Sequence, residues 1–250
     1  VLSTALSNHN LVESTLSQGF NQIPTIDNET NLKVEPVFEG LKFPTSMAFV
    51  GPNDILVLEK NNGTVKRIVN GTLLPTSLNV NVATEGGRGM LGINVAEHGK
   101  SNSPYVFLYF IELSGKKDHD AETGGKARLY RYELKDNLLT NSKLLLDVSG
   151  ERGVGNHPDE FHNGGKILIG RDQNIYLVVG ELSGRHTPTM NVLGRDLPDG
   201  NSGILRVTFD GKPVKGGSII GDKDPLNKYF AYGIRNSFGM DFDPVTGNLW

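Results

Sequence analysis

His162 is the residue whose setting in the sequence is best suited to acid–base chemistry. An imidazole exchanges protons near neutral pH, and His162-Asn-Gly-Gly165 leads directly into a strand-like run at 166–169. Two adjacent glycines let the backbone turn tightly, which would bring the imidazole to one face of the fold. The same residues, taken alone, also fit a loop histidine that caps a strand.

A second group of reactive side chains precedes this histidine. The segment His157-Pro-Asp-Glu-Phe-His162 holds two imidazoles and two carboxylates within six positions. The two histidines are five residues apart around a proline, which is not a metal-ligand spacing on a helix. The segment is therefore interpreted as a solvated acidic loop near the mouth of a site, with a metal site as the alternative.

Composition excludes several classes of protein and of chemistry. The 250-residue chain contains no cysteine, which excludes disulfides, zinc–thiolate sites, iron–sulfur clusters and a cysteine nucleophile. Its net charge of −3 gives no electrostatic reason to expect a nucleic-acid partner. Apolar runs stay far below the ~20 residues that span a bilayer, so no transmembrane segment is expected in this sequence.

Short strands and turns follow one another from residue 33 onward, and no segment there keeps a helical apolar period for ten or more positions. The Asn62-Gly63 pair between two β-rich runs predicts a hairpin. Strands are predicted at 34–38, 46–49, 54–59, 64–69, 90–95, 105–111, 128–134, 166–169, 174–179, 204–209, 229–232 and 239–242. The predicted class is therefore all-β.

A repeated pattern of small or apolar residues, a turn and a hydrophobic strand begins near residues 47, 90, 167 and 240. A recurring unit of ~40–50 residues made of four short strands is typical of a β-propeller blade. Residues 33–250 leave room for about five such blades, so we expect an incomplete ring.

The two ends of the chain differ in character. Residues 1–32 are rich in Ser, Thr, Asn and Gln, and we interpret them as a polar leader or linker, with a short packed helix as the alternative. Residues 33–250 form the predicted propeller. Because the sequence stops at Trp250 inside a strand-like run, we expect further sequence of this domain after it.

Several segments, in order, resemble the soluble quinoprotein glucose/sorbosone dehydrogenases. They include Val37-Phe-Glu-Gly-Leu-Lys-Phe-Pro-Thr-Ser-Met-Ala-Phe49, Arg88-Gly-Met-Leu-Gly-Ile93, His162-Asn-Gly-Gly-Lys-Ile167, Gly203-Ile-Leu-Arg-Val207 and Tyr232-Gly-Ile-Arg-Asn236. The last of these continues through Gly239-Met-Asp-Phe-Asp-Pro244. The resemblance covers residues 34–250 and implies a six-bladed β-propeller, here incomplete.

The resemblance also implies an activity: oxidation of an aldose-type sugar to its lactone, with pyrroloquinoline quinone (PQQ) and Ca²⁺ as cofactors. His162 matches the family's catalytic base, which takes the proton of the sugar hydroxyl as hydride leaves. Arg235 matches a residue that contacts the cofactor and stabilises the negative charge that develops on the quinone. Asn236 matches a second residue that contacts the cofactor. The metal ligands are expected beyond Trp250, and the location outside the cytoplasm. The sequence does not identify the sugar or the electron acceptor.

Departures from the family pattern keep other functions open. Phe161 stands where an Asp precedes the histidine in one branch of the family, Gly87 replaces a Gln, and Glu181 replaces an Asp. One alternative is a non-catalytic propeller that binds a glycan or a protein. Another is a propeller hydrolase such as a lactonase, for which the sequence shows no convergent set of carboxylates. Arg235 and Asn236 would then serve only to tie one blade to the next.

Overall fold

The computed structural model describes residues 34–97, 103–113, 125–148, 162–182 and 200–250. The chain divides into two units, Val1–Glu39 and Gly40–Trp250. Of the first unit only residues 34–39 are described, and they form no strand. All further description concerns the second unit.

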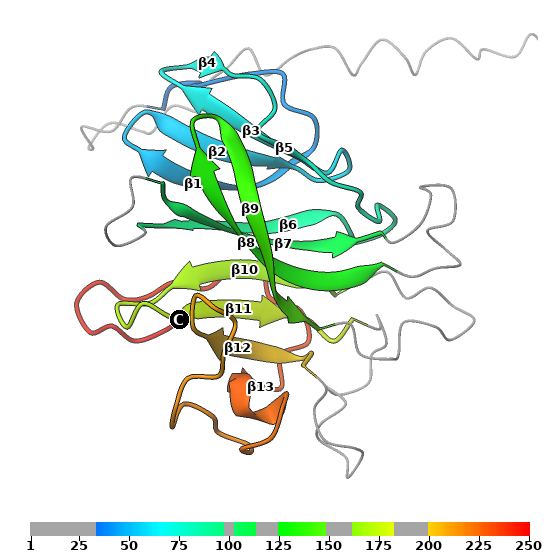
Figure 1. Ribbon diagram of the computed structural model, residues 1–250, viewed down its shortest axis with the longest axis vertical. Coiled ribbons are helices and arrows are strands. Elements are labelled where there is room, and N and C mark those ends of the chain that lie inside the picture. Colours follow the sequence, from blue (N-terminus) through cyan, green and yellow to red (C-terminus); the bar gives the residue numbers. More distant parts are fainter. Residues whose placement is uncertain (1–33, 98–102, 114–124, 149–161, 183–199) are drawn as a thin grey trace, which may run out of the picture. The chain divides into compact units, whose positions relative to one another are not determined.

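Three antiparallel sheets follow one another along the chain (Figure 1). The first contains β1 (Pro44–Gly51), β2 (Asp54–Glu59), β3 (Thr64–Val69), β4 (Thr72–Leu73) and β5 (Leu78–Asn79). The second contains β6 (Met90–Ala96), β7 (Tyr105–Glu112), β8 (Lys126–Lys135) and β9 (Leu138–Asp147). The third contains β10 (Gly164–Ile169), β11 (Ile175–Val179), β12 (Gly203–Val207) and β13 (Tyr229–Tyr232), with the short 3-10 helix η2 (Leu226–Lys228) before β13.

Most predicted strands are confirmed, as is the hairpin at Asn62-Gly63, where Glu59 pairs with Thr64. The strands predicted at 34–38 and 239–242 are wrong. In the first segment Val34 and Val37 are exposed and no described strand pairs with them. In the second, only Phe242 forms an isolated bridge, to Leu249.

The described residues show how the repeat in the sequence relates to the sheets. They hold three complete sheets, starting at residues 44, 90 and 164, and the beginning of a further unit at 239–250. The second and third units are longer than the predicted 40 residues, because long segments separate their strands. The six-bladed ring stays a prediction.

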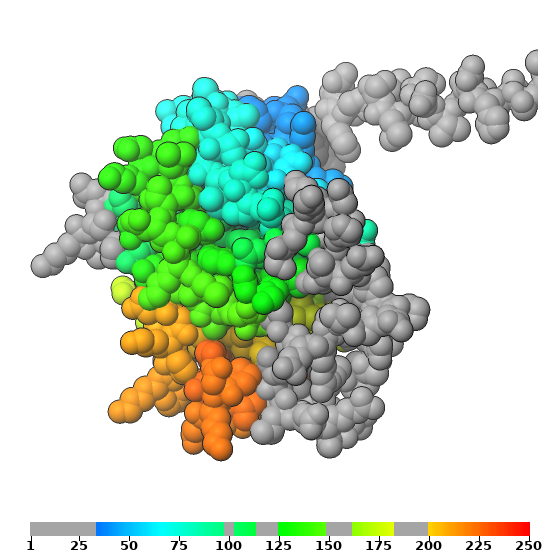
Figure 2. Space-filling model, turned by 45° about the vertical axis from the view of Figure 1, so that its right-hand side comes forward, coloured from blue at the N-terminus to red at the C-terminus, as the bar shows by residue number. Residues whose placement is uncertain are grey.

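The core lies between the sheets. Strand β7 is buried on both faces: Val106, Leu108 and Phe110 pack toward the first sheet, and Phe107 and Tyr109 toward the third. Figure 2 shows the sheets as consecutive bands, blue to cyan for the first, green for the second, and yellow to orange for the third. A sheet covered on both faces explains why the whole run at 105–111 is apolar.

Strands β1, β6 and β10 lie side by side, each the first strand of its sheet. The Thr45 hydroxyl donates to the Met90 carbonyl at 2.8 Å, and the Asn94 amide donates to the Ile167 carbonyl at 3.0 Å. The first contact joins the start of β1 to the start of β6, and the second joins the middle of β6 to the middle of β10. The segments that lead into these strands therefore meet at one edge of the structure.

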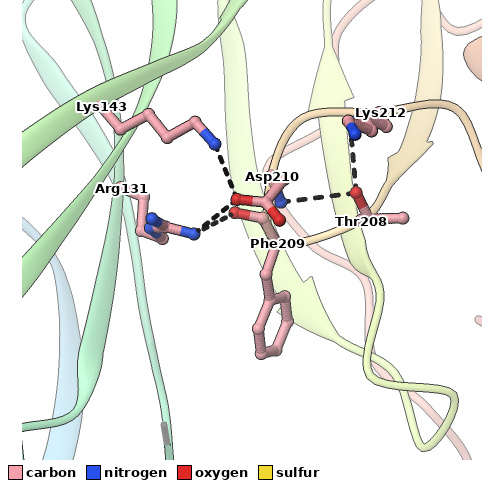
Figure 3. A network of polar contacts seen from close by, with 6 residues as sticks. All are labelled: Arg131, Lys143, Thr208, Phe209, Asp210 and Lys212. Atoms are coloured by element: carbon pink, nitrogen blue, oxygen red, sulfur yellow. Dashed lines mark hydrogen bonds and ion pairs between the residues drawn. The ribbon is translucent and has the colours of Figure 1, made fainter.

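A polar network fixes the third sheet to the second (Figure 3). Arg131 of β8 donates from Nη1 to the Phe209 carbonyl and to Asp210 Oδ1, both at 3.0 Å, and Lys143 of β9 donates to the same Asp210 oxygen at 2.6 Å. The Thr208 hydroxyl oxygen accepts hydrogen bonds from the backbone N–H groups of Asp210 and Lys212. The turn after β12 is thus held both internally and by the neighbouring sheet.

Among the residues described, no helix has the length and apolar character needed to cross a membrane.

Candidate functional site

His162 is placed by an unusual backbone conformation just before β10. Its φ angle is +62°, in the left-handed region, and Gly164 and Gly165 follow at +67° and +123°. Such angles cost a β-carbon-bearing residue free energy but glycine very little. The two glycines therefore permit the tight turn that the sequence indicated, and the strain falls on the histidine itself.

A buried carboxylate orients the His162 ring. Nδ1 lies 2.5 Å from Glu181 Oε1, and the exposed fractions of the two side chains are 14% and 0%. An ionised carboxylate offers only acceptor atoms, so it fixes the proton on Nδ1 and leaves the lone pair on Nε2. Within the described part of the chain, Nε2 has no hydrogen-bond partner. This arrangement leaves Nε2 able to accept a proton.

Arg235 is linked to this pair through the backbone. The Glu181 N–H donates to the Arg235 carbonyl at 3.0 Å. Gly180 lies where these segments meet, since a β-carbon there would be 1.8 Å from the His162 carbonyl oxygen and 3.1 Å from that of Arg235. The close approach needs a glycine, and it brings the exposed Arg235 to the same edge as the histidine.

Asn236 contacts the histidine segment directly. Its Oδ1 accepts the Gly164 N–H at 3.3 Å. The amide oxygen therefore supports the turn after His162, while its Nδ2 group makes no hydrogen bond to any described residue. The three predicted site residues thus gather around one turn, although their chemical roles stay predictions.

Glu181 is a site residue that the sequence reasoning missed, having treated it only as a replacement for Asp. The available signal was its position two residues after the apolar run 175–179. A carboxylate so close to a buried strand is expected to need a hydrogen-bond or charge partner. The segment with His157, Asp159, Glu160 and Phe161 lies outside the described residues.

The turn before β6 lies at the same edge and is shaped by a buried lysine. Lys60, 9% exposed, donates from Nζ to Asn61 Oδ1 and to the carbonyls of Thr84 and Gly86, at 3.1, 3.5 and 3.2 Å. Burial lowers the pKa of Lys60. Gly87 and the buried Arg88 belong to this turn, which the ammonium group holds by its two carbonyl contacts.

The described residues contain no group of three or more His, Asp or Glu side chains that could hold a metal ion. They bring together His162, the Glu181 carboxylate that orients its ring, the backbone of Arg235 and the side-chain amide of Asn236. Such a set suits removal of a proton from a hydroxyl next to an anionic or electron-accepting group.

Comparison with known proteins places this arrangement in context. Residues 41–250 match the family described as Glucose / Sorbosone dehydrogenase. Quinoprotein glucose dehydrogenase B of Acinetobacter calcoaceticus is 26% identical over 233 residues, which cover 86% of this chain and 46% of that protein. The chain spans between 46% and 60% of the length of the curated relatives it matches.

Two solved structures share the fold. A putative oxidoreductase (glucose dehydrogenase) from Thermus thermophilus aligns with a TM-score of 0.69 and 25% identity, over 87% of this chain and 60% of that one. The PQQ-bound aldose sugar dehydrogenase of Streptomyces coelicolor aligns with a TM-score of 0.66 and 24% identity, over 86% and 57%. The predicted β-propeller class is thereby confirmed.

Proposed function

Because the chain belongs to the glucose/sorbosone dehydrogenase family, we propose that the protein oxidises an aldose-type sugar to its lactone with PQQ as cofactor. The observation that carries this proposal is the His162–Glu181 pair at 2.5 Å, with Arg235 bonded through its carbonyl to the same glutamate. Family membership supports the reaction class, and the contacts among His162, Glu181, Arg235 and Asn236 support the proposed roles.

His162 is the proposed base. Its Nε2 accepts the proton of the sugar C1 hydroxyl while hydride leaves the C1 carbon, so that a carbonyl forms without a high-energy cation. Glu181 holds the ring in the tautomer that this step needs and stabilises the imidazolium once the proton has arrived. PQQ, when bound, supplies the electron-pair acceptor for the hydride.

The donor set fits such a cofactor. PQQ carries carboxylates and quinone oxygens, which accept hydrogen bonds, and the side chains of Arg235 and Asn236 carry N–H groups that can donate them. Arg235 would bind and stabilise negative charge, and Asn236 would orient the ring. We propose Ca²⁺ as a second cofactor, with ligands from outside the described residues.

The proposal extends to surroundings and partners. A sugar is the proposed substrate, the electron acceptor is unknown, and the net charge of −3 gives no reason to add a nucleic acid. The family resemblance favours a location outside the cytoplasm.

Steady-state assay of the complete protein with PQQ, Ca²⁺, a panel of aldoses and a dye acceptor tests the proposal. The wild type should reduce the dye, and His162→Gln should lower kcat by about 10²–10⁴-fold, the usual contribution of a general base. Lys215→Gln, a change at an exposed side chain with no described contact, should match the wild type. No dye reduction by the wild type, or full activity in His162→Gln, would remove the dehydrogenase function; sugar binding without turnover would favour a non-catalytic propeller.

A further inference from the structure

We propose that Tyr109, on β7 of the second sheet, is a positioning residue for His162. This inference rests on the proposed function for its kinetic consequence, whereas its structural content stands without it. Tyr109 touches neither sugar nor cofactor in this account. It acts through the backbone of the segment that presents the histidine.

The contact is made by a single buried hydroxyl group. Tyr109 is 0% exposed, and its hydroxyl donates to the Asn163 carbonyl at 3.0 Å. Asn163 follows His162 directly and is itself buried. Burial raises the pKa of Tyr109, so the phenol stays a neutral hydrogen-bond donor across the physiological range.

The Asn163 carbonyl is a sensitive point at which to hold this turn. It belongs to the peptide unit between Asn163 and Gly164, next to two residues whose φ angles are positive. A left-handed histidine persists only if its surroundings fix it. A hydrogen bond to this carbonyl restrains the backbone that directly follows His162.

Hydrogen bonds from different parts of the fold reach this turn. The Leu182 N–H donates to the His162 carbonyl at 3.3 Å, and the Gly164 N–H donates to Asn236 Oδ1 at 3.3 Å. Both come from segments attached to the third sheet. Tyr109 supplies the contact from the second sheet, and its hydrogen bond is the shortest of the three. The histidine is thereby fixed relative to the neighbouring blade.

Tyr109→Phe in the complete protein removes the hydroxyl and keeps the ring. Tyr229→Phe is the matched control, because Tyr229 is also 0% exposed and its hydroxyl also donates to a backbone carbonyl, that of Asn201, at 2.6 Å. The Tyr229 hydroxyl also accepts a hydrogen bond from the Gly200 N–H at 2.9 Å, and the Asn201 segment bonds to Gly180 through Ser202. The two variants lose the same group at different turns.

The first readout is independent of catalysis. In protein labelled with ¹⁵N-histidine, the proton shared by His162 Nδ1 and Glu181 should give a far-downfield resonance, assigned by its loss in His162→Gln. Tyr109→Phe should shift or broaden this resonance, and Tyr229→Phe should leave it in place. If the wild type lacks turnover, this readout still tests the inference while the proposed function fails.

The second readout is the split between kcat and KM. Tyr109→Phe should lower kcat about tenfold with KM for the sugar unchanged, because a misplaced base weakens the chemical step and not sugar binding. Tyr229→Phe should stay within about twofold of the wild type. The proposal is overturned if Tyr109→Phe matches the wild type in both readouts, or if both variants change alike. A Tyr109→Phe protein that does not fold also overturns it, because the hydroxyl would then serve the sheet and not the histidine.

Discussion

At the scale of single residues, the site depends on one carboxylate and one imidazole. Glu181 is fully buried yet bonded to His162 Nδ1, and its backbone is bonded to Arg235. A buried carboxylate of this kind is costly unless it is paired. In the proposed function, this carboxylate sets the tautomer and the orientation of the histidine.

Glu181→Gln should lower kcat on the order of 10- to 100-fold with little change in sugar KM. A glutamine amide can donate to Nδ1, which would place the imidazole proton on Nε2 and leave no lone pair for the substrate. Steady-state kinetics of the complete protein measures this effect. Glu181→Asp is the control, since it keeps the charge and should retain more activity than Glu181→Gln; equal activity of Glu181→Gln and the wild type would contradict the assigned role.

The sequence predicted His162, Arg235 and Asn236 as site residues, and the structure gathers them around one turn. The sequence did not reveal that Glu181 and Tyr109 make the hydrogen bonds that hold this turn and its histidine. Both lie in or beside apolar runs, where a single polar atom has no periodic signature. Only the pairing of strands from different sheets shows that the Tyr109 hydroxyl meets the Asn163 carbonyl.

At the scale of elements, the turn after β12 is held by charges of the second sheet. The Asp210 carboxylate accepts hydrogen bonds from Lys143 and Arg131. The hydrogen bonds and positive charges of these two residues, with Lys143 contributing most, hold the pKa of Asp210 below its usual value. A group whose pKa is lowered in the folded state contributes stability above its unfolded value, near pH 4, and loses that contribution as the pH falls through the lowered value.

Asp210→Asn should therefore lower the free energy of unfolding by about 0.5–1 kcal/mol at pH 7, the range of an exposed ion pair after solvent screening. The difference from the wild type should shrink as the pH drops below about 4, where the native aspartate also loses its charge. Urea denaturation at several pH values measures both effects. Asp222→Asn, whose side chain has no described contact, should show no such dependence; a difference that persists unchanged at a pH of about 2 would contradict the account.

Strands were predictable where a β-rich run followed a turn signal, as for β2 after Gly51-Pro-Asn53 and β3 after Asn62-Gly63. Strand β9 (Leu138–Asp147) was missed, because a polar run, Thr-Asn-Ser-Lys, interrupts its leucines and Asn141 there is left-handed. The strand predicted at 34–38 failed for the opposite reason. Its residues favour a strand, but pairing needs a neighbour, and local sequence does not reveal one.

At the scale of the molecule, the packing of the three sheets against one another holds the turns that form the candidate site in place. The second sheet contacts the first through one face of β7 and the third through the other. The repeat in the sequence indicated this architecture, whereas the number of blades depended on insertions that periodicity does not measure. A site built from turns of adjacent sheets needs this core to stay intact.

Leu108→Ala should lower the free energy of unfolding by about 2–5 kcal/mol, because Leu108 is 0% exposed between the first and second sheets and its loss leaves a cavity. Leu138→Ala, at a side chain 55% exposed, should change it by less than about 0.5 kcal/mol. Urea denaturation of the complete protein compares the two. Equal effects would contradict the central position of β7.

The most direct test of the central claim is a single-turnover experiment on the complete protein. The protein is loaded with PQQ and Ca²⁺, mixed with an aldose, and followed by the absorbance of the quinone. Wild type and His162→Gln should bind PQQ alike, and reduction by the sugar should be at least about 10²-fold slower in the variant. Absence of PQQ binding by the wild type, or equal rates in the two proteins, would contradict the central claim.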